Sequence, residues 1–175
     1  MIVSVIGSQN VEKLAKILGK NKKEINEMIS EVAKIIAESG NEIIAVPEGL
    51  QGFFMKKYKE FGGKKAIGVV PKEDKQWGHE WLEHHLCDET LNAKTWFEQP
   101  FFMMTDCDIV VMMGFGLCTI GELSFLKFPW SRKKPKPKVL VVKEFLRGKL
   151  PEELAYDLRG HIEYIGIKEL GKKLR

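Results

Sequence analysis

One stretch of the sequence, residues 108–122, constrains the fold more than any other. It contains an unbroken apolar run, Ile109–Met113, which ends at Gly114-Phe115-Gly116. Apolar residues with helical spacing follow from Leu123 onward. A short apolar run bounded by glycine is typical of a strand buried on both faces of a parallel sheet. The order of these segments predicts a strand, a tight glycine turn and the N-terminus of a helix.

The predicted helix carries Thr119 and Glu122 at the spacing of a capping box. In this interpretation the Thr119 hydroxyl caps the first turn and Glu122 bonds back to the backbone. The first turn of a helix presents unpaired N–H groups and a partial positive charge, which favour an anion such as phosphate. We therefore predict a phosphate-binding turn, with these ligand-binding residues: Gly114, Gly116, Cys118 and Thr119.

Both polar residues of this turn have a second interpretation. Glu122 is suited to holding a ribose hydroxyl, or to stabilising an oxocarbenium-like sugar during hydrolysis, as well as to capping. Thr119 is suited to bonding a phosphate oxygen as well as to capping the helix. The sequence alone leaves these roles open, and both roles of Glu122 are compatible with each other.

Two further strand-to-helix turns contain glycine. The apolar run 2–6 ends at Gly7-Ser8, where glycine permits close approach of a ligand and Ser8 offers a hydroxyl. A surface turn without a ligand is the alternative interpretation of that pair. The apolar run 43–46 ends in the second glycine-containing turn, residues 47–52. The ligand-binding residues predicted from these two turns are Gly7, Ser8, Gly49, Leu50 and Gly52.

The order of the remaining elements predicts the fold class. A strand at 66–70 follows a short helix at 53–58, which makes a βαβ unit whose right-handed crossover keeps the strands parallel. Further strands are predicted at 139–142 and 162–165. Further helices are predicted at 13–18, 25–36 and 168–174, and one more begins with residues 151–154. We expect an α/β, three-layer Rossmann-like fold with a mainly parallel sheet and helices on both faces. The three glycine turns then meet at one edge of the sheet.

Composition limits the classes of partner. The chain has 175 residues, of which 44% are hydrophobic, so we expect a single domain over residues 1–175. The net charge of +4 suits a phosphate ligand but is too small to predict nucleic-acid binding. No apolar run reaches membrane-spanning length, and the three cysteines lack C-x-x-C spacing. We expect a cytoplasmic protein with reduced thiols and no membrane contact.

Residues 72–100 do not predict regular elements. The run Gly78-His79-Glu80-Trp81-Leu82-Glu83-His84-His85 misses the H-E-x-x-H metal motif, because position 83 is Glu. A metal site built from His79 with Glu83, or Glu80 with His84, is the minor alternative, and we expect no metal. The aromatic segments 77–81 and 96–102 suit a groove edge or a subunit contact, and we predict a homodimer or higher homo-oligomer. The Pro- and Lys-rich segment 127–138 is expected to be an exposed connection.

In this order and spacing the chain resembles the lysine-decarboxylase-like, or LONELY GUY (LOG), branch of the SLOG superfamily. The family begins with a strand and a Gly-Ser turn, matched by Gly7-Ser8, and later has a strand ending in G-V-I-P, matched by Gly68-Val69-Val70-Pro71. Its signature P-G-G-x-G-T-x-x-E falls on residues 114–122. Gly116, Thr119 and Glu122 match the signature, whereas Gly114, Phe115 and Cys118 replace Pro, Gly and Gly.

The resemblance implies two functions, which we keep as alternatives. Hydrolytic members cleave the N-glycosidic bond of nucleoside 5′-monophosphates with the signature Glu and an upstream Arg of an E-R-K segment. Glu122 corresponds to the signature Glu, and Glu98 matches the Glu of the E-R-K segment. Gln99 stands at the Arg position, and a neutral amide cannot supply the charge of a guanidinium. Other relatives resemble nucleotide-binding or molybdenum-cofactor-carrier proteins.

We therefore predict first a protein that binds a nucleotide or nucleotide-like cofactor. The alternative is a phosphoribohydrolase in which Glu122 and Glu98 are catalytic. Neither function needs a bound cofactor for activity, and the ligand expected in both is a phosphate or a nucleotide. The resemblance also implies a homodimer.

Overall fold

The computed structural model describes residues 1–75, 78–127 and 136–175. The strands of these ranges form one sheet of seven parallel strands in the order β4-β3-β2-β1-β5-β6-β7. They are β1 (Ile2–Gly7), β2 (Glu42–Ala45), β3 (Ala66–Pro71), β4 (Glu89–Ala93), β5 (Ile109–Met113), β6 (Lys138–Val142) and β7 (Ile162–Ile165). The predicted α/β class with a parallel sheet is confirmed.

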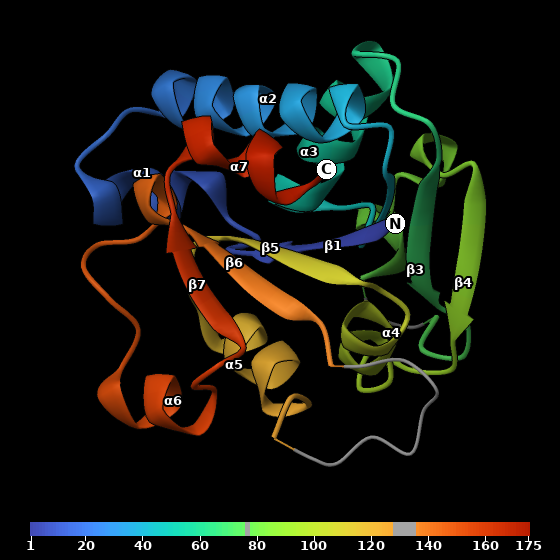
Figure 1. The fold of residues 1–175 in the computed structure, drawn as a ribbon. Coiled ribbons are helices and arrows are strands. Elements are labelled where there is room, and N and C mark those ends of the chain that lie inside the picture. The colour runs from blue at the N-terminus through green and yellow to red at the C-terminus, as the bar shows by residue number, and fades with distance from the viewer. Residues whose placement is uncertain (76–77, 128–135) are drawn as a thin grey trace.

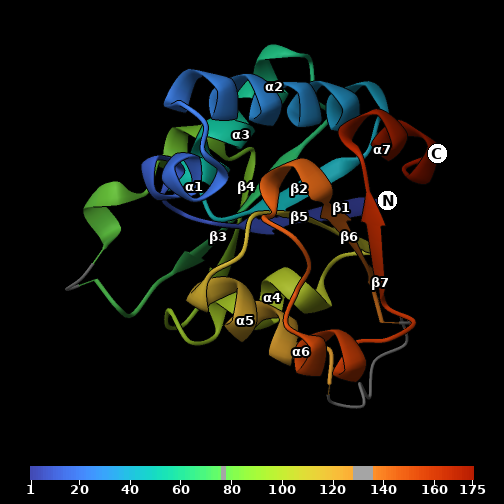
Figure 2. The same cartoon turned by 90° about the vertical axis from the view of Figure 1, so that its left-hand side faces the viewer.

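Helices cover both faces of this sheet and make three layers (Figure 1). One layer contains α1 (Val11–Leu18), α2 (Lys22–Glu38), α3 (Gly49–Glu60) and α7 (Ile167–Lys173). The other contains α4 (Gln99–Thr105), α5 (Leu117–Ser124) and α6 (Glu152–Asp157), as the turned view in Figure 2 shows. Short 3₁₀ turns lie at His79–Trp81, His84–Leu86 and Lys143–Phe145. Of the helices in the described ranges, none has both the length and the apolar character that a membrane span requires.

Side chains that alternate along the central strands contribute to two hydrophobic cores, one on each face of the sheet. Successive side chains of a strand point to opposite faces, so Val5 joins the core under α1, α2 and α3, and Ile6 joins the core above α4 and α5. Val111 and Met112 of β5 divide in the same way. Both faces of the central strands are therefore buried, which explains why their sequences are continuous apolar runs.

The edge strand β4 has no such run, and the sequence did not predict it. Three of its five residues are exposed and only Ala93 is buried. A strand at the edge of a sheet with one covered face needs few apolar residues, so periodicity gives little signal. The predicted aromatic position Trp77 and residues 128–135 of the Pro- and Lys-rich segment lie outside the described residues.

The strand order places a topological switch beside β1. The chain builds outward from β1 through β2 and β3 to β4, then returns to the other side of β1 with β5. Connections leave the carboxyl ends of β1 and β5 in opposite directions, and a crevice opens at such a point. The fold therefore positions a site at the carboxyl ends of the central strands.

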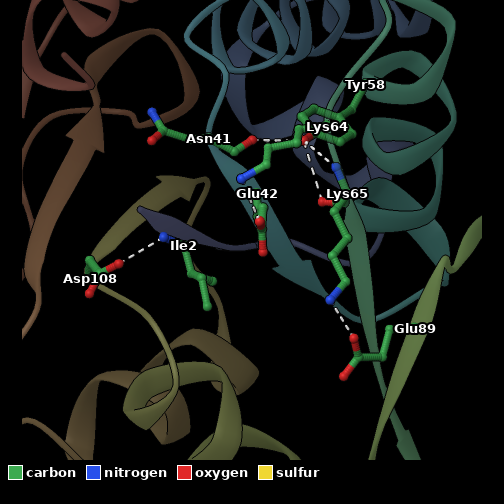
Figure 3. Close-up of polar contacts among 8 residues, drawn as sticks. All are labelled: Ile2, Asn41, Glu42, Tyr58, Lys64, Lys65, Glu89 and Asp108. Atoms are coloured by element: carbon green, nitrogen blue, oxygen red, sulfur yellow. Dashed lines mark hydrogen bonds and ion pairs between the residues drawn. The ribbon is translucent and has the colours of Figure 1, made fainter.

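The opposite edge, at the amino ends of the strands, is held by polar contacts (Figure 3). The Asp108 carboxylate accepts a hydrogen bond from the Ile2 amide at 2.7 Å. The Tyr58 hydroxyl donates to the Asn41 carbonyl at 2.7 Å and accepts from the Lys65 amide at 3.2 Å. Two ion pairs join neighbouring strands there, Lys64 with Glu42 and Lys65 with Glu89. These contacts tie the strand starts together, so we assign this edge a structural role.

The predicted capping box in α5 is wrong. The helix begins at Leu117, with Gly116 as its N-cap, three residues before the predicted N-cap Thr119. Thr119 is therefore the third helical residue and Glu122 lies one turn further on, and both side chains are buried. Across the described residues, neither the Thr119 hydroxyl nor the Oε2 atom of Glu122 has a hydrogen-bond partner.

Candidate functional site

A cavity of about 380 Å³ lies at the carboxyl ends of the strands. It is bounded by the turn after β1, the turn after β2, the start of α4 and one side of α5. Its volume is within the range typical of small-molecule sites, roughly 300–1,000 Å³. The lining residues are Gln9, Val46, Glu48, Gln51, Trp81, Trp96, Phe97, Gln99, Pro100, Leu117, Cys118, Gly121 and Glu122.

Gln9 joins the three predicted turns, although the sequence did not single it out. Its side-chain amide donates to Glu48 Oε1 at 2.9 Å, and its carbonyl accepts from the Leu50 amide at 3.1 Å. The Cys118 thiol donates to Gln9 Oε1 at 3.8 Å. Gln9 therefore contacts the turn after β2 and the first turn of α5. Its position directly after Gly7-Ser8 is the only sequence signal for this role.

Two of the predicted glycines allow the turns to approach each other. A Cβ atom at Gly7 would lie 1.9 Å from the Met113 carbonyl oxygen of the adjacent strand. A Cβ atom at Gly49 would lie 2.5 Å from the Gln9 carbonyl oxygen, and the φ of Gly49 is +53°, which favours glycine. These positions exclude a side chain because another segment of the chain fills the space. Their glycines therefore have a packing role in the structure.

The other predicted ligand-binding residues occupy different environments. Leu50 and Gly52 lie in the first turn of α3, which begins at Gly49, four residues before the predicted helix, and both are buried. Gly114 packs against Ser8, whose amide donates to Met113. Gly116 is more open, because a Cβ atom there would meet no described atom within 4 Å. Within the described residues, only Cys118 of this predicted set lines the 380 Å³ cavity.

Two buried carboxyl groups line the cavity. Glu122 is 3% exposed, and its burial raises the pKa of its carboxyl group to about 8. Glu48 is 8% exposed, and burial raises its pKa as well. Glu48 Oε1 accepts from Gln9, whereas Oε2 of each glutamate lacks a hydrogen-bond partner in the part of the chain that the structure describes.

Gln99 and Glu98 are the residues that the family resemblance aligned with an Arg and a Glu. They are neighbours at the start of α4, but their side chains have different environments. Gln99 lines the cavity and is 7% exposed, and its Nε2 atom has no partner among the described residues. Glu98 is the N-cap residue of α4, and its Oε2 atom accepts from the Lys94 amide at 2.7 Å. Glu98 is absent from the described lining of the cavity. The structure thus brings Glu122 together with Gln99 but not with Glu98.

Aromatic and aliphatic side chains form the walls and mouth. Trp81 and Trp96 line the cavity, and Phe97 and Leu117 are 89% and 87% exposed at its opening. Flat aromatic surfaces favour stacking with a planar ring. In the described lining there is no Lys, Arg or His. The cavity therefore combines apolar walls with carboxyl and amide groups, and it lacks a described cation for phosphate.

A second, more open cavity of about 510 Å³ adjoins the first. The two share Gln9, Glu48 and Trp81. The second cavity is also lined by the first residues of α1 and by Gly49 at the start of α3, where helix N–H groups favour an anion. Lys22 lies there as well, 3.2 Å from Glu12.

The histidine-rich segment makes contacts within the fold. His79 Nε2 lies 2.5 Å from the Pro71 carbonyl oxygen at the end of β3. The rings of His79 and His84 have centroids 6.4 Å apart. A group of three or more His, Cys, Asp or Glu side chains suited to a metal ion does not occur among residues 1–75, 78–127 and 136–175.

Solved structures share this fold. The chain is similar over 99% of its length to the molybdenum cofactor carrier protein of Chlamydomonas reinhardtii, with 19% identity, 96% of that chain covered and a TM-score of 0.65. It is also similar over 99% of its length to the molybdenum cofactor binding protein of the phototrophic bacterium Rippkaea orientalis, with 15% identity, 94% of that chain covered and a TM-score of 0.68. No protein-family model and no curated protein sequence matches the chain. These likenesses show the Rossmann-like fold.

Proposed function

We propose that this protein binds a nucleotide or a nucleotide-like cofactor at the carboxyl ends of its parallel strands. One observation carries the proposal. Three side chains of the cavity, Glu48, Glu122 and Gln99, are more than nine-tenths buried, yet each has a polar atom without a hydrogen-bond partner among the described residues. Such atoms cost free energy, and their concentration in residues that line one cavity supports a polar ligand there.

The shape and walls of the site support a ligand with a planar ring. Trp81 and Trp96 provide aromatic surface beside the polar groups. On the lining of the adjoining cavity, the N-termini of α1 and α3 and Lys22 favour a phosphate group, whereas Glu48 and Glu12, which pairs with Lys22, oppose it. The two structural neighbours are described by name as binding or carrying the molybdenum cofactor, which agrees with a small-molecule site in this fold.

Several finer features belong to the same proposal. We place the chain near the LOG branch of the SLOG superfamily, on the residues that match its signature. We propose that Gly114, Gly116 and Thr119 act through the start of α5 in ligand binding. A cytoplasmic location is supported by three free cysteines, of which Cys118 is exposed.

The alternative function is hydrolysis of the N-glycosidic bond of a nucleoside 5′-monophosphate. A specific observation favours it, because burial holds Glu122 protonated near neutral pH, and a protonated carboxyl group can act as a general acid. Two observations weigh against it. Gln99 occupies the position of the family's Arg, and the Glu98 carboxylate bonds to the backbone at Lys94 outside the described cavity lining. Binding is therefore our primary proposal.

Calorimetry with a panel of nucleoside 5′-monophosphates, combined with an assay for released base, tests both functions. We expect saturable binding of at least one nucleotide without release of base. Binding that weakens at least tenfold in Glu122→Gln would place the ligand at the cavity, since a lost hydrogen bond that leaves a buried polar group unpaired changes affinity by about that factor.

Other outcomes would contradict the primary proposal. Release of base that disappears in both Glu122→Ala and Glu98→Gln would favour the hydrolase. Absence of binding for the whole panel and for the molybdenum cofactor would overturn nucleotide-like ligand binding. The exposed Glu27→Gln on α2 is the matched control for the loss of one carboxylate.

A further inference from the structure

The histidine-rich segment lies against the candidate site. Its residue Trp81 lines the 380 Å³ cavity and also the adjoining 510 Å³ cavity. We name residues 78–83 the Trp81 turn, since the 3₁₀ turn His79–Trp81 lies inside this range. A side chain that lines both cavities can contact a ligand in either of them.

Trp81 and Trp96 both line the 380 Å³ cavity, but their environments differ. Trp96 packs against the core that α4 and α5 cover, whereas Trp81 belongs to neither hydrophobic core of the described residues. Trp81 is 52% exposed. Exposed aromatic surface on a cavity wall is typical of a small-molecule site. Trp81 is therefore better placed than Trp96 to offer the face of its ring to a ligand.

Contacts on both sides hold this turn on the sheet. His79 Nε2 lies 2.5 Å from the Pro71 carbonyl oxygen, and since a carbonyl oxygen only accepts, Nε2 carries the proton and donates it. The Glu83 amide donates to the Pro47 carbonyl oxygen at 2.7 Å. Leu82 is 8% exposed and belongs to a hydrophobic core.

These contacts fix the Trp81 turn at the edge of the sheet where the cavities lie. Pro71 is the last residue of β3, and Pro47 stands between β2 and Glu48, which lines both cavities. In a 3₁₀ turn three residues complete one revolution, so side chains two positions apart point in different directions. His79 can therefore bond to the end of β3 while Trp81 faces the cavities.

Gly78 brings the start of the turn close to both tryptophan rings. It is buried and its φ is +80°, which favours glycine. A Cβ atom at this position would lie 2.9 Å from Cζ2 of Trp96 and 3.5 Å from Cε3 of Trp81. Both rings therefore lie close to the same backbone, and the placement of the Trp81 ring depends on the placement of the turn.

We propose, resting on the proposed function above, that the planar ring of the ligand stacks on Trp81 and that His79 is the positioning residue of Trp81. Every planar aromatic ring has a π face, so stacking on an indole adds affinity without selecting one base. The hydrogen bond from His79 to Pro71 holds the turn, and the Trp81 ring with it. The ligand class that this wall suits is a compound with a flat aromatic ring system.

Calorimetry and tryptophan fluorescence with the 5′-monophosphates of adenosine, guanosine, cytidine and uridine test the stacking. Trp81→Leu should weaken the nucleotide that binds the wild type most tightly by about 5- to 100-fold, the usual range for one stacked base. Trp81→Phe should keep the affinity within about fivefold, because phenylalanine also stacks. A base that stacks on an indole quenches its fluorescence, so saturating nucleotide should quench the wild type and quench Trp81→Phe much less.

Tyr156→Leu is the matched control for the loss of an exposed ring. Tyr156 lies on α6, is 65% exposed and is absent from the described lining of both cavities. Its replacement should change neither the nucleotide affinity nor the quenching.

The role of His79 is tested with His79→Ala and His79→Gln, because a glutamine amide can place a donor near the position of Nε2. We expect His79→Ala to weaken nucleotide binding by about 3- to 10-fold and to reduce the quenching at saturation, since the ring is no longer held. His79→Gln should restore the affinity to within about twofold of the wild type and should restore the quenching. A lower melting temperature of His79→Ala with unchanged quenching at saturation would overturn the positioning role.

Other results overturn the proposal while leaving the proposed function intact. Unchanged affinity and quenching in Trp81→Leu would exclude stacking on this ring. A lower mass of Trp81→Leu in light scattering, with the affinity of the wild type, would assign the ring to a subunit contact instead. A His79→Gln variant that behaves as His79→Ala does would exclude the hydrogen bond to Pro71 as the means of positioning.

Failure of the wild type to bind any of these nucleotides or the molybdenum cofactor would overturn the proposed function and the stacking together. This outcome is distinct from the others because it appears in the wild type, before any variant is compared. Melting curves of each variant show that the folded protein is being measured.

Discussion

At the scale of single residues, Glu122 has an environment that its sequence position did not indicate. Its spacing from Thr119 suggested a carboxylate bonding to a helix end. In the structure α5 starts at Leu117, so Glu122 faces inward and is 3% exposed. Removal from water disfavours the charged form of a carboxyl group, and its pKa rises to about 8.

This burial predicts a pH-dependent stability. The folded-state pKa lies above the unfolded value near 4.5, so the folded state holds an extra proton between those two values. Stability from this group is therefore greatest below about pH 4.5 and decreases as the pH rises toward about 8. The full difference is several kcal/mol, since each tenfold change in protonation equilibrium is worth about 1.4 kcal/mol.

Thermal or urea unfolding of the wild type and Glu122→Gln from about pH 5 to about pH 9 measures the effect. We expect the wild type to lose stability relative to the variant across this range, because glutamine does not ionise. Parallel stability curves for the two proteins would contradict a buried, protonated Glu122.

At the scale of elements, glycines set how closely the turns pack. The turn after β1 reaches the end of β5 through Gly7, and the start of α3 reaches the turn after β1 through Gly49. The sequence correctly indicated that three glycine turns belong together. From the sequence we predicted that these glycines leave space for a ligand. In the structure, Gly7 and Gly49 leave space for neighbouring backbone instead.

The contact at Gly7 predicts a large effect for Gly7→Ala. The added methyl group would lie 1.9 Å from the Met113 carbonyl oxygen, so β1 and β5 must separate locally. We expect a loss of about 2–4 kcal/mol in the free energy of unfolding, measured with urea. Ser8→Ala at the next position is the control, and it should stay within about 0.5 kcal/mol of the wild type. A loss for Gly7→Ala as small as that of the control would contradict this packing.

Helix α5 offers a change that separates stability from ligand binding. Gly121 lies inside α5 and lines the cavity, and a Cβ atom there would meet no described atom within 4 Å. Gly121→Ala should stabilise the helix by about 0.5–1 kcal/mol and narrow the cavity, which weakens ligand binding.

Gly171→Ala in α7 is the matched control for Gly121→Ala. It has the same propensity effect, and its Cβ atom would make an ordinary 3.5 Å contact with Ile35, away from the cavity. In that control the melting temperature should rise, whereas the nucleotide affinity should stay equal to that of the wild type. Unchanged affinity in Gly121→Ala would contradict a ligand seated against α5.

At the scale of the whole molecule, the strand order creates the site. β1 lies between β2 and β5, and the cavity draws its residues from the segments that follow β1, β2, β3, β4 and β5. No single segment contains more than a small part of it. The edge at the amino ends is instead tied by Asp108, Tyr58 and the ion pairs of Lys64 and Lys65 (Figure 3).

The exposed apolar side chains around the cavity mouth are relevant to the oligomeric state of the protein. Phe97 and Leu117 are 89% and 87% exposed, and Trp81 is 52% exposed. We expect these residues to take part in the predicted homodimer, because such apolar surface favours association. Light scattering should give twice the 20.0 kDa chain mass, and Leu117→Lys should shift the protein toward monomer. A monomeric wild type at all concentrations would contradict the dimer.

The sequence by itself determined the class of fold and the edge at which a site would form. Apolar runs such as Ile109–Met113 are typical of strands buried inside a parallel sheet, and their glycine turns mark the carboxyl ends. Cys118 was selected from its place in the glycine turn, and Glu122 from its spacing to Thr119 and from the family signature, and both line the cavity. These features were predictable because they depend on local periodicity and turn chemistry.

Only the tertiary structure decided which side chains meet. Gln9 and Glu48 have no local pattern that distinguishes them, and Gln99 was marked only as the residue at the family's Arg position. The three become a set because the segments after β1 and β2 and the start of α4 converge. The start of α5 and the edge strand β4 were also decided by tertiary contacts, since Thr119 and Glu122 of α5 are buried against the fold and β4 is held by pairing with β3. The physical reason is that burial, and hence the raised pKa of Glu122, depends on neighbours that are distant in the sequence.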